Sequence, residues 1–591
     1  MSGPWFQTSP ERCQYELEAL SAAGIEYSID SKAQAAGIFR LELRIAHGST
    51  FALPDGEPLR LAAIYPDHFP YFRPEVFVSE LLLPRHQHPF ARNLCLLARS
   101  TVFWNPEWTL AALLQRQLAT VLTAGRIVDP ALLAETPGEQ AEPFTDYLNY
   151  YPPAMVLVDG SVIPPAGQTQ GRLVVGIPPN SAVTPQALLL ELRGNRGDVI
   201  AKATAALAEF FPRRVEGWWY RLTEPPIAGD GEIVANWLEK QTFWQRRRGS
   251  GTLVANGTIL GVTAVVFPSE TSPGIQSAAW AFLIHVKVST EQPGPRGKPV
   301  RTTKQVSYFA QLGQVGKQEA LERAPRLRAL GKAKIAVAGL GCLGAPSVLE
   351  LARSGVGGLR LLDHDTVDPA TTLRWPFGLP AFGKAKVEVL AEFINRNYPH
   401  IRIEQTLVHR IGAIRGDSSQ RAEWQVLDQF LNGASLVFDA SAEDGVSHFL
   451  SQLASERGLP YIMIYGTQGG WGGVVLRQVP GRTAGCWMCF KHALNDNTIT
   501  APPADASGAV QPLGCADPTF TGTSFDMQNI VLAGVRLAVA TLCHNVEDGY
   551  EDLNWDVGVL ALNDGQGAPI APIWQTYKLQ RHAACPYCEQ G

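Results

Sequence analysis

A glycine-rich turn between two apolar segments is the feature of this sequence whose residue types best suit chemistry. The stretch reads KIAVAGLGCLGAPSVLELARSGVGGLRLLDHDTV, and its turn holds Gly339, Gly341 and Gly344. Glycine lets the backbone approach a phosphate at the N-terminus of the next helix, where unpaired N–H groups and the helix dipole favour negative charge. The pattern predicts a βαβ nucleotide-binding unit, with a helix that begins at Ala345 and a second strand that ends at Asp363.

The residues after this unit carry acids and bases in close succession. Asp363 follows the last glycine by about 20 residues, the spacing of a carboxylate that accepts hydrogen bonds from ribose hydroxyls. Asp365, Arg374 and Lys386 come next. Arginine and lysine neutralise phosphates while aspartate holds magnesium, so this order favours a triphosphate over a nicotinamide. We therefore expect ATP and Mg²⁺ as ligands.

The turn and the charged residues together resemble the ThiF/MoeB and ubiquitin-activating superfamily, whose pattern is GxGxxG, then DxD, then N-x-x-R, then G-x-x-K. The match covers Gly339, Gly341, Gly344, Asp363, Asp365, Arg374 and Lys386. The family's Asn falls on Thr371 in this chain. The resemblance implies adenylation by ATP, with these residues binding the nucleotide and with Arg374 and Lys386 also acting in catalysis.

A later acid belongs to the same resemblance. In the family, a D-x-x-D at the end of another strand lies near the magnesium and the α-phosphate. Asp439 matches its first acid and is implied as a catalytic and nucleotide-binding residue, whereas the second position is Ala442. Glu443 and Asp444 are both candidates for the role of that second acid.

Two Cys-x-x-Cys pairs lie in the C-terminal region, Cys486 with Cys489 and Cys585 with Cys588. Each pair offers two thiolates to one tetrahedral ion, so two pairs predict a four-sulfur structural zinc site; redox pairs are the alternative. The ThiF/MoeB pattern has the same arrangement, in which Zn²⁺ holds the C-terminus to the domain.

Between the pairs, Cys515 stands in a loop rich in Gly, Pro and Thr, ahead of a helix expected to begin near Ser524 to Asp526. Such a loop can lower a thiol pKa by placing sulfur near backbone N–H groups. Activating enzymes that form thioesters carry their cysteine on a crossing loop in this part of the chain. The resemblance therefore implies that Cys515 is the first acyl-accepting thiol.

The N-terminal part contains YPDHFPYFRPEVFV, then HQHPFARNLCLL, then a tryptophan, a proline and a helix that enters through Pro106 and Thr109. This order resembles the ubiquitin-conjugating enzyme fold and implies that Cys95 carries an acyl group as a thioester. A buried structural cysteine is the alternative. The family's His-Pro-Asn ends in Phe90 here, so Asn93 or a histidine, His86 or His88, would have to hold the oxyanion.

Length and pattern divide the 591 residues into three domains. We expect an α+β ubiquitin-conjugating-like domain (1–145), a linker and mainly β middle domain (146–318), and an α/β Rossmann-like ThiF/MoeB adenylation domain with the zinc site (319–591). Short alternating segments predict the strands of the middle domain, with one Ala-rich helix around Ile200 to Phe211. The residues of the middle domain form no catalytic pattern.

Composition excludes several classes. A net charge of -5 creates no general attraction to nucleic acid or anionic lipid. The N-terminus lacks a signal-like apolar run and no stretch resembles a membrane span, so we expect a cytoplasmic protein. Nine cysteines in so long a chain are not a disulfide framework; in a reducing compartment they are metal ligands, nucleophiles or core residues.

A conjugating-like module ahead of an activating-like module resembles the bacterial fusion proteins associated with CD-NTases in CBASS anti-phage operons. The resemblance implies that ATP activates the C-terminal carboxylate of the CD-NTase, that Cys515 and then Cys95 carry it, and that an amine of a target protein receives it. It also implies a homodimer. Three alternatives stay open: conjugation of a separate ubiquitin-like protein, a sulfur-carrier adenylyltransferase, and a non-catalytic scaffold in which Thr371, Ala442 and Phe90 mark lost chemistry.

Overall fold

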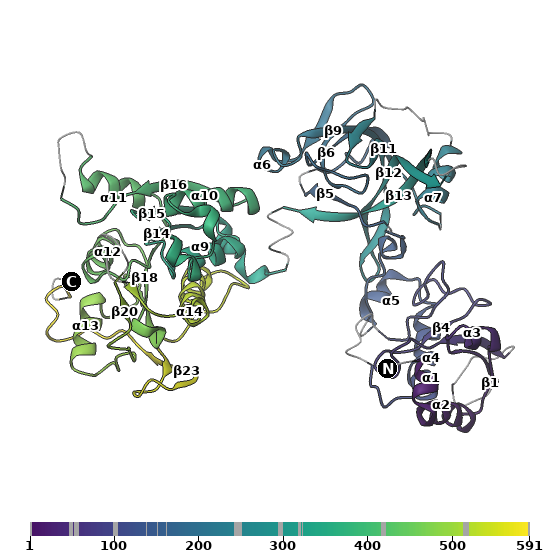
Figure 1. Cartoon of the computed structure of the whole chain (residues 1–591), viewed down its shortest axis with the longest axis horizontal. Helices are drawn as coiled ribbons and strands as arrows, with labels where there is room; N and C mark the ends of the chain where they lie inside the picture. The colour runs from purple at the N-terminus through teal and green to yellow at the C-terminus, as the bar shows by residue number, and fades with distance from the viewer. Residues whose placement is uncertain are drawn as a thin grey trace. The chain divides into compact units, whose positions relative to one another are not determined.

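The chain folds into two compact units, seen in a computed structural model of residues 1–591 (Figure 1). Unit 1 comprises 1–204 and 208–313, and unit 2 comprises 205–207 and 314–591. The structure describes residues 3–46, 51, 58–97, 104–136, 139–150, 152–160, 162–227, 229–241, 251–293, 299–316, 321, 323–414, 421–511 and 519–588. Each unit is described by itself.

Unit 1 begins with a small sheet of four antiparallel strands in the order β1-β2-β3-β4. Its strands are β1 (Ile25–Ile29), β2 (Arg40–Ile45), β3 (Leu59–Ile64) and β4 (Glu75–Phe77). Its helices are α1 (Trp5–Thr8), α2 (Pro10–Ala22), α3 (Ser31–Ala35), α4 (Leu110–Ala124) and α5 (Pro130–Glu135). Buried and exposed side chains alternate along strand β2, with Leu41, Leu43 and Ile45 buried. The helix predicted after Thr109 is confirmed as α4, and the Thr109 side chain caps it by accepting from the Ala112 N–H.

The second part of unit 1 is a nine-stranded sheet whose ends meet. The hydrogen-bonded order is β10-β11-β12-β13-β5-β7-β6-β9, and β9 also pairs with β11, so the strands from β11 round to β9 close into a barrel. The closure passes through Gly217, where a Cβ would lie 1.8 Å from the Val262 carbonyl oxygen.

The barrel strands are β5 (Met155–Asp159), β6 (Gln170–Ile177), β7 (Gln186–Arg193), β8 (Val199–Lys202), β9 (Arg213–Arg221), β10 (Thr252–Val254), β11 (Gly257–Ser272), β12 (Ile275–Pro293) and β13 (Pro299–Val315). Helices α6 (Ala205–Ala208) and α7 (Gly231–Glu239) and the 3-10 turn η2 (Phe144–Tyr147) accompany them. The predicted mainly β character of this region is thus observed. The helix predicted around Ile200 to Phe211 is present only as the four residues of α6, because the first residues of that range belong to β8, which pairs with β7. Pairing with a neighbouring strand outweighs the helix propensity of the alanines.

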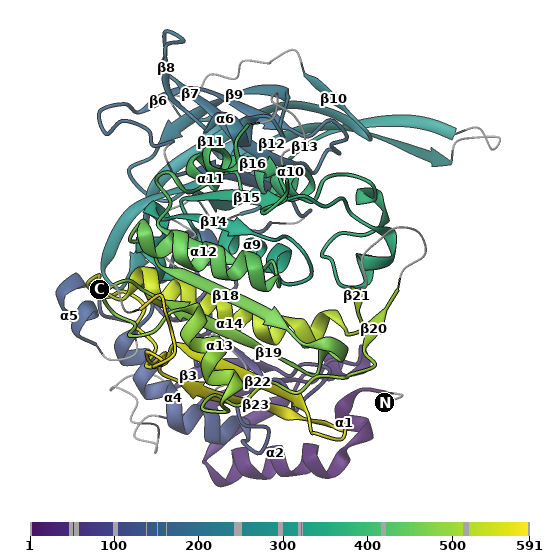
Figure 2. The same ribbon diagram turned by 90° about the vertical axis from the view of Figure 1, so that its left-hand side faces the viewer.

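Unit 2 is built on an eight-stranded sheet of order β16-β15-β14-β17-β18-β19-β22-β23 (Figure 2). Its strands are β14 (Lys334–Ala338), β15 (Gly358–Asp363), β16 (Arg402–Val408), β17 (Leu436–Asp439), β18 (Tyr461–Gly466), β19 (Gly472–Gln478), β22 (Val557–Asn563) and β23 (Pro569–Tyr577). The strands from β16 to β18 are parallel and the last three are antiparallel. Strands β14 and β17 are almost wholly buried, as expected of parallel strands covered on both faces.

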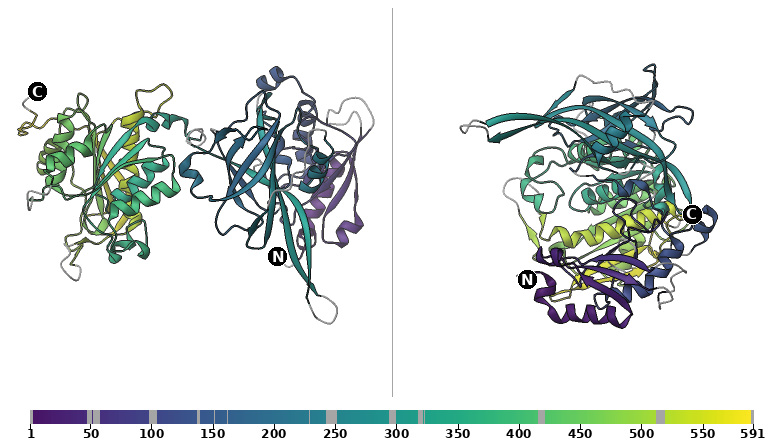
Figure 3. Two further views of the ribbon diagram at one scale, coloured as in Figure 1. Left: turned by 90° about the horizontal axis from the view of Figure 1, so that it is seen from above. Right: turned by 90° about the vertical axis from the view of Figure 1, so that its right-hand side faces the viewer.

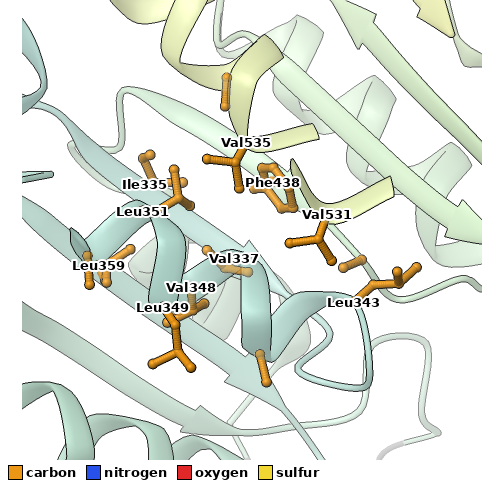
Figure 4. Close-up of a cluster of buried hydrophobic side chains, with 14 of the residues drawn as sticks. Ile335, Val337, Leu343, Val348, Leu349, Leu351, Leu359, Phe438, Val531 and Val535 are labelled. Carbon is orange, nitrogen blue, oxygen red and sulfur yellow. The ribbon is translucent and has the colours of Figure 1, made fainter. Parts of the chain in front are cut away.

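Helices cover both faces of this sheet (Figure 3). Helices α9 (Gly344–Arg353), α10 (Lys386–Asn397) and α14 (Ser524–Cys543) share one apolar core. Helices α11 (Glu423–Leu431), α12 (Asp444–Glu456) and α13 (Trp487–Asn495) contribute to the other. Figure 4 shows Val348 and Leu351 of α9 and Val531 and Val535 of α14 gathered around Val337 and Phe438. This packing holds the glycine turn at the carboxyl end of β14.

Shorter elements complete unit 2: the strand pair β20 (Ala509–Val510) and β21 (Thr519–Phe520), and the 3-10 turns η4 (Pro325–Lys332), η5 (Pro369–Leu373), η6 (Leu379–Ala381) and η7 (Gln468–Gly470). Among the described residues, α14 alone is long and apolar enough to cross a membrane. Its residues pack against β18 and β19 inside the fold, which accounts for its apolar composition.

Candidate active site

The glycine turn at the end of β14 leaves room on one side and is tightly packed on the other. A Cβ on Gly339, whose φ is 79°, would lie 2.6 Å from the backbone nitrogen of Ser441, and one on Gly344 would lie 1.8 Å from the Gly339 carbonyl oxygen. No atom of the described residues lies within 4 Å of the position a Cβ would take on Gly341. The backbone at Gly341 therefore faces open space at the start of α9, as a phosphate-binding turn requires.

Asp363 lies at the end of β15 and braces this turn. Its Oδ2 accepts from the Leu340 N–H at 2.5 Å and its Oδ1 accepts from the Asp365 N–H at 2.8 Å. The residue is only 7% exposed. The predicted ribose carboxylate thus fixes the loop that precedes the ligand position, while each of its oxygens retains a further lone pair.

Asp365 and Lys386 form an ion pair on the same side of the turn. Lys386 Nζ lies 2.7 Å from Asp365 Oδ2, and His364 Nε2 lies 3.3 Å from Asp365 Oδ1. Partial burial opposes ionisation, but the Lys386 ammonium outweighs it and lowers the pKa of Asp365. The ligand atoms of Asp363, His364 and Asp365 lie within 4.8 Å of one another, so two carboxylates of the kind Mg²⁺ prefers stand together here.

Arg374 reaches across to β21. Its Nη2 donates to Thr519 Oγ1 at 3.0 Å, its Nη1 donates to the Phe520 carbonyl oxygen, and its guanidinium lies 4.6 Å from the centre of the Phe520 ring. Thr371, which replaces the family's Asn, donates its hydroxyl hydrogen to the Asp368 carbonyl oxygen at 2.8 Å. Arg374 therefore connects the predicted phosphate-binding residues to the segment that follows Cys515.

Asp439 is fully buried at the end of β17. Its Oδ1 accepts from the N–H and the hydroxyl of Ser441 at 2.9 and 2.7 Å, and its Oδ2 accepts from the Tyr461 hydroxyl at 2.7 Å. Burial, together with the adjacent Asp439 carboxylate, raises the pKa of Tyr461 well above its usual value, so this hydroxyl stays a donor. The structure thus gives Asp439 a bracing role at the edge of the site.

The position of the second acid is occupied by Ala442, whose φ of 58° lies in the left-handed region. Glu443 precedes α12 and Asp444 is its first residue. The Asp444 side chain is 75% exposed and pairs with Lys491 Nζ at 2.8 Å. Both acids are near the end of β17, and the geometry favours neither of them over the other.

The four cysteines of the two C-terminal pairs gather in one buried cluster. Their sulfurs are separated by 3.9 Å (Cys486 to Cys489), 3.6 Å (Cys486 to Cys585) and 3.5 Å (Cys489 to Cys588). A Zn–S distance of about 2.3 Å in a tetrahedron places the sulfurs about 3.8 Å apart, so the donor set fits a Zn²⁺ ion. The His582 N–H donates to the Cys489 sulfur at 3.3 Å, a contact that would support a thiolate.

Cys515 lies outside the described residues, which resume at Thr519. Cys95 lies in unit 1, half-buried, in the second arm of a short antiparallel turn. Its N–H donates to the His86 carbonyl oxygen at 2.7 Å, and Gln87 and Leu94 form a bridge beside it. The Asn93 Oδ1 is buried without a hydrogen-bond partner among the described residues.

The surroundings of His86 contain charged residues that the sequence pattern did not indicate. The His86 ring contacts Glu139 and Glu142, and its neighbour Arg85 pairs with Glu270 of β11. No local spacing connects these residues, because they lie more than 50 positions from His86 along the chain. Their approach depends on the tertiary fold alone.

Comparisons with known proteins match the part of the chain that contains this candidate active site. The ThiF family matches residues 310–542, a range that contains the glycine turn, Asp363, Arg374, Lys386 and Asp439. The uncharacterized protein y4oA of Sinorhizobium fredii is 30% identical over 606 residues, 98% of this chain and 97% of that protein. The uncharacterized protein y4qC of the same organism is 31% identical over 586 residues, 96% of this chain and 95% of that protein. This chain belongs to the family of y4oA and y4qC.

The C-terminal part of this y4oA/y4qC family member is a ThiF/MoeB-like adenylyltransferase domain. Molybdopterin-synthase adenylyltransferase of Salmonella typhimurium is 28% identical over 186 residues, 31% of this chain and 68% of that enzyme. A solved structure of E. coli MccB aligns with a TM-score of 0.32 and 17% identity, covering 45% of this chain and 69% of that chain. The expectation of a ThiF/MoeB-like domain at the C-terminus is therefore confirmed.

Proposed function

We propose that this protein is an ATP-dependent ligase that activates the C-terminal carboxylate of a protein and transfers it, by way of Cys515 and Cys95, to an amine. The observation that carries the first step is the set of residues around the open glycine turn, within the range matched by the ThiF family. Gly341 presents backbone to the phosphates, Asp363 supports the ribose end, and Lys386 and Arg374 neutralise charge.

In the activation step the carboxylate oxygen attacks the α-phosphorus of ATP, an acyl-adenylate forms, and pyrophosphate leaves with its Mg²⁺. Lys386 is held by Asp365 at 2.7 Å in the free protein, so binding of a triphosphate would exchange one anionic partner for another. Asp365 would then be available to the magnesium ion.

Contacts of Arg374 support the assignment of Cys515 as the first thiol. Arg374 holds Thr519 and Phe520, and Cys515 precedes Thr519 by four positions. Four residues of extended chain span at most about 14 Å, a separation along the chain short enough for Cys515 to serve the site that Arg374 borders. Its thiolate would attack the acyl carbon, forming a thioester and releasing AMP.

The second transfer uses Cys95. A thiolate at Cys95 would displace the Cys515 thiolate from the acyl group, and a target amine would then attack the new thioester, releasing the thiol and leaving an amide. The half-buried Cys95 and its position opposite His86 are the features that support this role. The four-cysteine cluster would hold Zn²⁺ as a structural ion, since it offers no position for water or substrate.

The carboxylate donor is proposed from the resemblance to the CBASS fusion proteins: the C-terminus of a CD-NTase. On the same resemblance, we propose that two copies of this chain form a homodimer. A separate ubiquitin-like protein and a sulfur carrier are the competing donors, and the similarity to molybdopterin-synthase adenylyltransferase makes the sulfur carrier a specific second candidate.

The test is intact-protein mass spectrometry of the chain mixed with ATP, Mg²⁺ and each candidate donor, under non-reducing conditions. Wild type is compared with Cys95→Ala, Cys515→Ala and the control Cys13→Ala. We expect a dithiothreitol-labile adduct that accumulates on Cys515 in Cys95→Ala and is absent in Cys515→Ala. The mass of the adduct identifies the donor.

Two outcomes would contradict the proposal. If Cys515→Ala still loads Cys95, the order of transfer is wrong. A product that ends as an acyl-adenylate or a thiocarboxylate, with neither cysteine modified, would identify a sulfur-transfer adenylyltransferase instead.

A further inference from the structure

A buried ion pair joins the N-terminal module of unit 1 to its barrel. Arg85 Nη1 lies 2.7 and 2.8 Å from the two carboxylate oxygens of Glu270, and the two residues are 7% and 5% exposed. Glu270 also accepts from the Glu142 N–H at 2.8 Å and from the Gly274 N–H at 2.6 Å. These contacts offset much of the cost of removing both charges from water, although the Arg85 Nε atom is buried without a hydrogen-bond partner among the described residues.

The second guanidinium nitrogen of Arg85 faces the segment that precedes the barrel. Arg85 Nη2 donates to the Gln140 carbonyl oxygen at 2.7 Å and lies 3.3 Å from Glu139 Oε2. Arg85 is thus bonded both to the end of β11 and to residues 139–140. Residues 139–140 are therefore a packed segment.

His86 continues the same network. Its N–H donates to Glu142 Oε1 at 2.9 Å, its Nε2 lies 2.9 Å from Glu139 Oε1, and its Nδ1 lies 3.3 Å from Glu142 Oε1. The Tyr147 hydroxyl donates to the other oxygen of Glu142 at 3.3 Å. His86 has a φ of 59°, a left-handed conformation that a non-glycine residue adopts when its surroundings enforce it.

Cys95 is attached to the far side of this network. Its N–H donates to the His86 carbonyl oxygen at 2.7 Å, and the His88 N–H donates to the Asn93 carbonyl oxygen at 2.8 Å. The bridge between Gln87 and Leu94 completes the register, which places His86 directly opposite Cys95. The backbone of Cys95 therefore follows the backbone of His86.

We propose that the barrel is part of the Cys95 site: the end of β11 and residues 139–147 hold Arg85 and His86, and these two positioning residues set the backbone of Cys95. The inference rests on the proposed function only for the chemical role of Cys95. It assigns the middle domain a purpose, since β11 contributes Glu270 to the support of the proposed acyl-carrying loop.

The network also makes this support dependent on pH. The hydrogen bond with Glu142 raises the pKa of His86, desolvation opposes the shift, and the bond with Glu139 adds to it. The charged groups that face His86 are Glu139 and Glu142, while Arg85, Glu270 and Tyr147 are one contact further away. Because the folded pKa is raised, the contribution of His86 is fully present below its unfolded pKa of about 6.5 and is lost as pH rises through the folded value.

The test is hydrogen exchange of the full chain by mass spectrometry, without ATP, on peptides from 86–97. In Glu270→Gln we expect exchange of these peptides to accelerate by about 30-fold, equivalent to losing two hydrogen bonds, because the amide nitrogen of glutamine would face two donors, while peptides from α4 are unchanged. Glu75→Gln, the same chemical change at an exposed position of β4, is the matched control and should leave both regions as in wild type. Equal exchange of 86–97 in Glu270→Gln and Glu75→Gln would overturn the proposal.

A second arm uses a variant that keeps the buried ion pair. His86→Asn retains a residue type that tolerates the left-handed conformation but removes the titrating ring. After correction for intrinsic exchange, protection of 86–97 should fall in wild type as pH rises from 6.5 to 8.5 and should be independent of pH in His86→Asn. A wild-type profile as flat as that of His86→Asn would contradict the role of His86, even if Glu270→Gln failed to fold.

Neither of the two hydrogen-exchange measurements requires ATP or an acyl donor. A negative result in them would therefore contradict the role of the network without bearing on the proposed ligase function. Where the donor supports adduct formation, Glu270→Gln should load Cys515 at the wild-type rate and transfer the acyl group to Cys95 more slowly. Unchanged transfer together with faster exchange would mean that the network is structural only.

Discussion

Two ion pairs of unit 2, one at Lys386 and one at Arg477, differ in how deeply they are buried and therefore suit different roles. The Lys386 side chain is 13% exposed and pairs with the half-exposed Asp365, a partner that it would exchange for a phosphate in the proposed reaction. Arg477, in contrast, is 1% exposed and its guanidinium contacts Asp552, Asp556 and the carbonyl oxygens of Leu553 and Trp555. The first pair is suited to binding and the second to holding β19 against the segment before β22.

Replacing Lys386 by alanine should weaken ATP binding about 10- to 100-fold, the effect of losing one charge-assisted hydrogen bond of about 1.5–3 kcal/mol. Isothermal titration with ATP and Mg²⁺ measures it directly. Lys384→Ala removes an exposed lysine from the same loop and serves as the control, since its affinity should stay near wild type. If Lys386→Ala and Lys384→Ala bound ATP with equal affinity, Lys386 would not be a nucleotide-binding residue.

The substitution Arg477→Met should lower the free energy of unfolding of unit 2 by about 3–5 kcal/mol, because it removes the hydrogen-bonded guanidinium from the buried carboxylate of Asp556 and leaves Lys578 Nζ, at 3.9 Å, as its remaining cation among the described residues. Urea-dependent hydrogen exchange of peptides from β14 and β17 reports this unit alone. The control is Arg457→Met, whose partner Asp428 is 60% exposed and whose loss should cost about 0–1 kcal/mol. If Arg477→Met also lowered the free energy of unfolding by only about 0–1 kcal/mol, Asp552 and Asp556 would be contacting water or other cations in the variant.

At the scale of elements, the four-cysteine cluster connects the N-terminus of α13 to the chain beyond β23. Cys486 precedes α13, Cys489 lies in its first turn, and Cys585 and Cys588 follow the last strand of the sheet. A bound ion would therefore close the chain of unit 2 on itself. The buried cores on either face of the sheet do not include these four residues, so the cluster supplies a separate constraint.

Elemental analysis should find about one zinc per chain in wild type and almost none in Cys585→Ser, since loss of one thiolate opens the tetrahedron. Chelation of the wild-type protein should accelerate hydrogen exchange at 579–588 to the level of Cys585→Ser. Cys13→Ser keeps its zinc as the control. Retention of a full equivalent of zinc by Cys585→Ser would place the metal elsewhere.

At the scale of the whole molecule, each unit carries one part of the proposed reaction. Unit 2 contains the adenylation residues and unit 1 contains Cys95 with the barrel residues that support it. Because one chain contains both units, the proposed transfer between them would be intramolecular, at an effective concentration on the order of 1 mM.

Cutting the chain between the units should separate the two steps. With a protease site placed between Gly316 and Leu321, cleavage should leave ATP-dependent loading of Cys515 intact and slow transfer to Cys95 by about 100- to 1000-fold at 1–10 μM protein. Rapid-quench mass spectrometry before and after cleavage measures both rates, with uncleavable protein treated with protease as the control. Undiminished transfer would show that the units stay associated without the covalent link.

The sequence alone determined the elements whose residues are close together in the chain. The βαβ unit around Gly339, helix α4 after Thr109 and the strands of the barrel follow from local periodicity and turn residues. The Cys-x-x-Cys spacing indicated which four residues would meet, because a chelating pair is a local motif. The helix predicted around Ile200 to Phe211 is shortened to α6, since residues 199–202 form a hairpin with β7.

Only the tertiary structure decided which charged groups meet across long separations. Glu270 reaches Arg85 over 185 positions, and Arg374 reaches Thr519 over 145. Asp439, expected beside magnesium, proved to be fully buried by Ser441 and Tyr461. Such contacts are set by how whole elements pack, and packing brings together residues whose separation along the chain leaves no periodic signal.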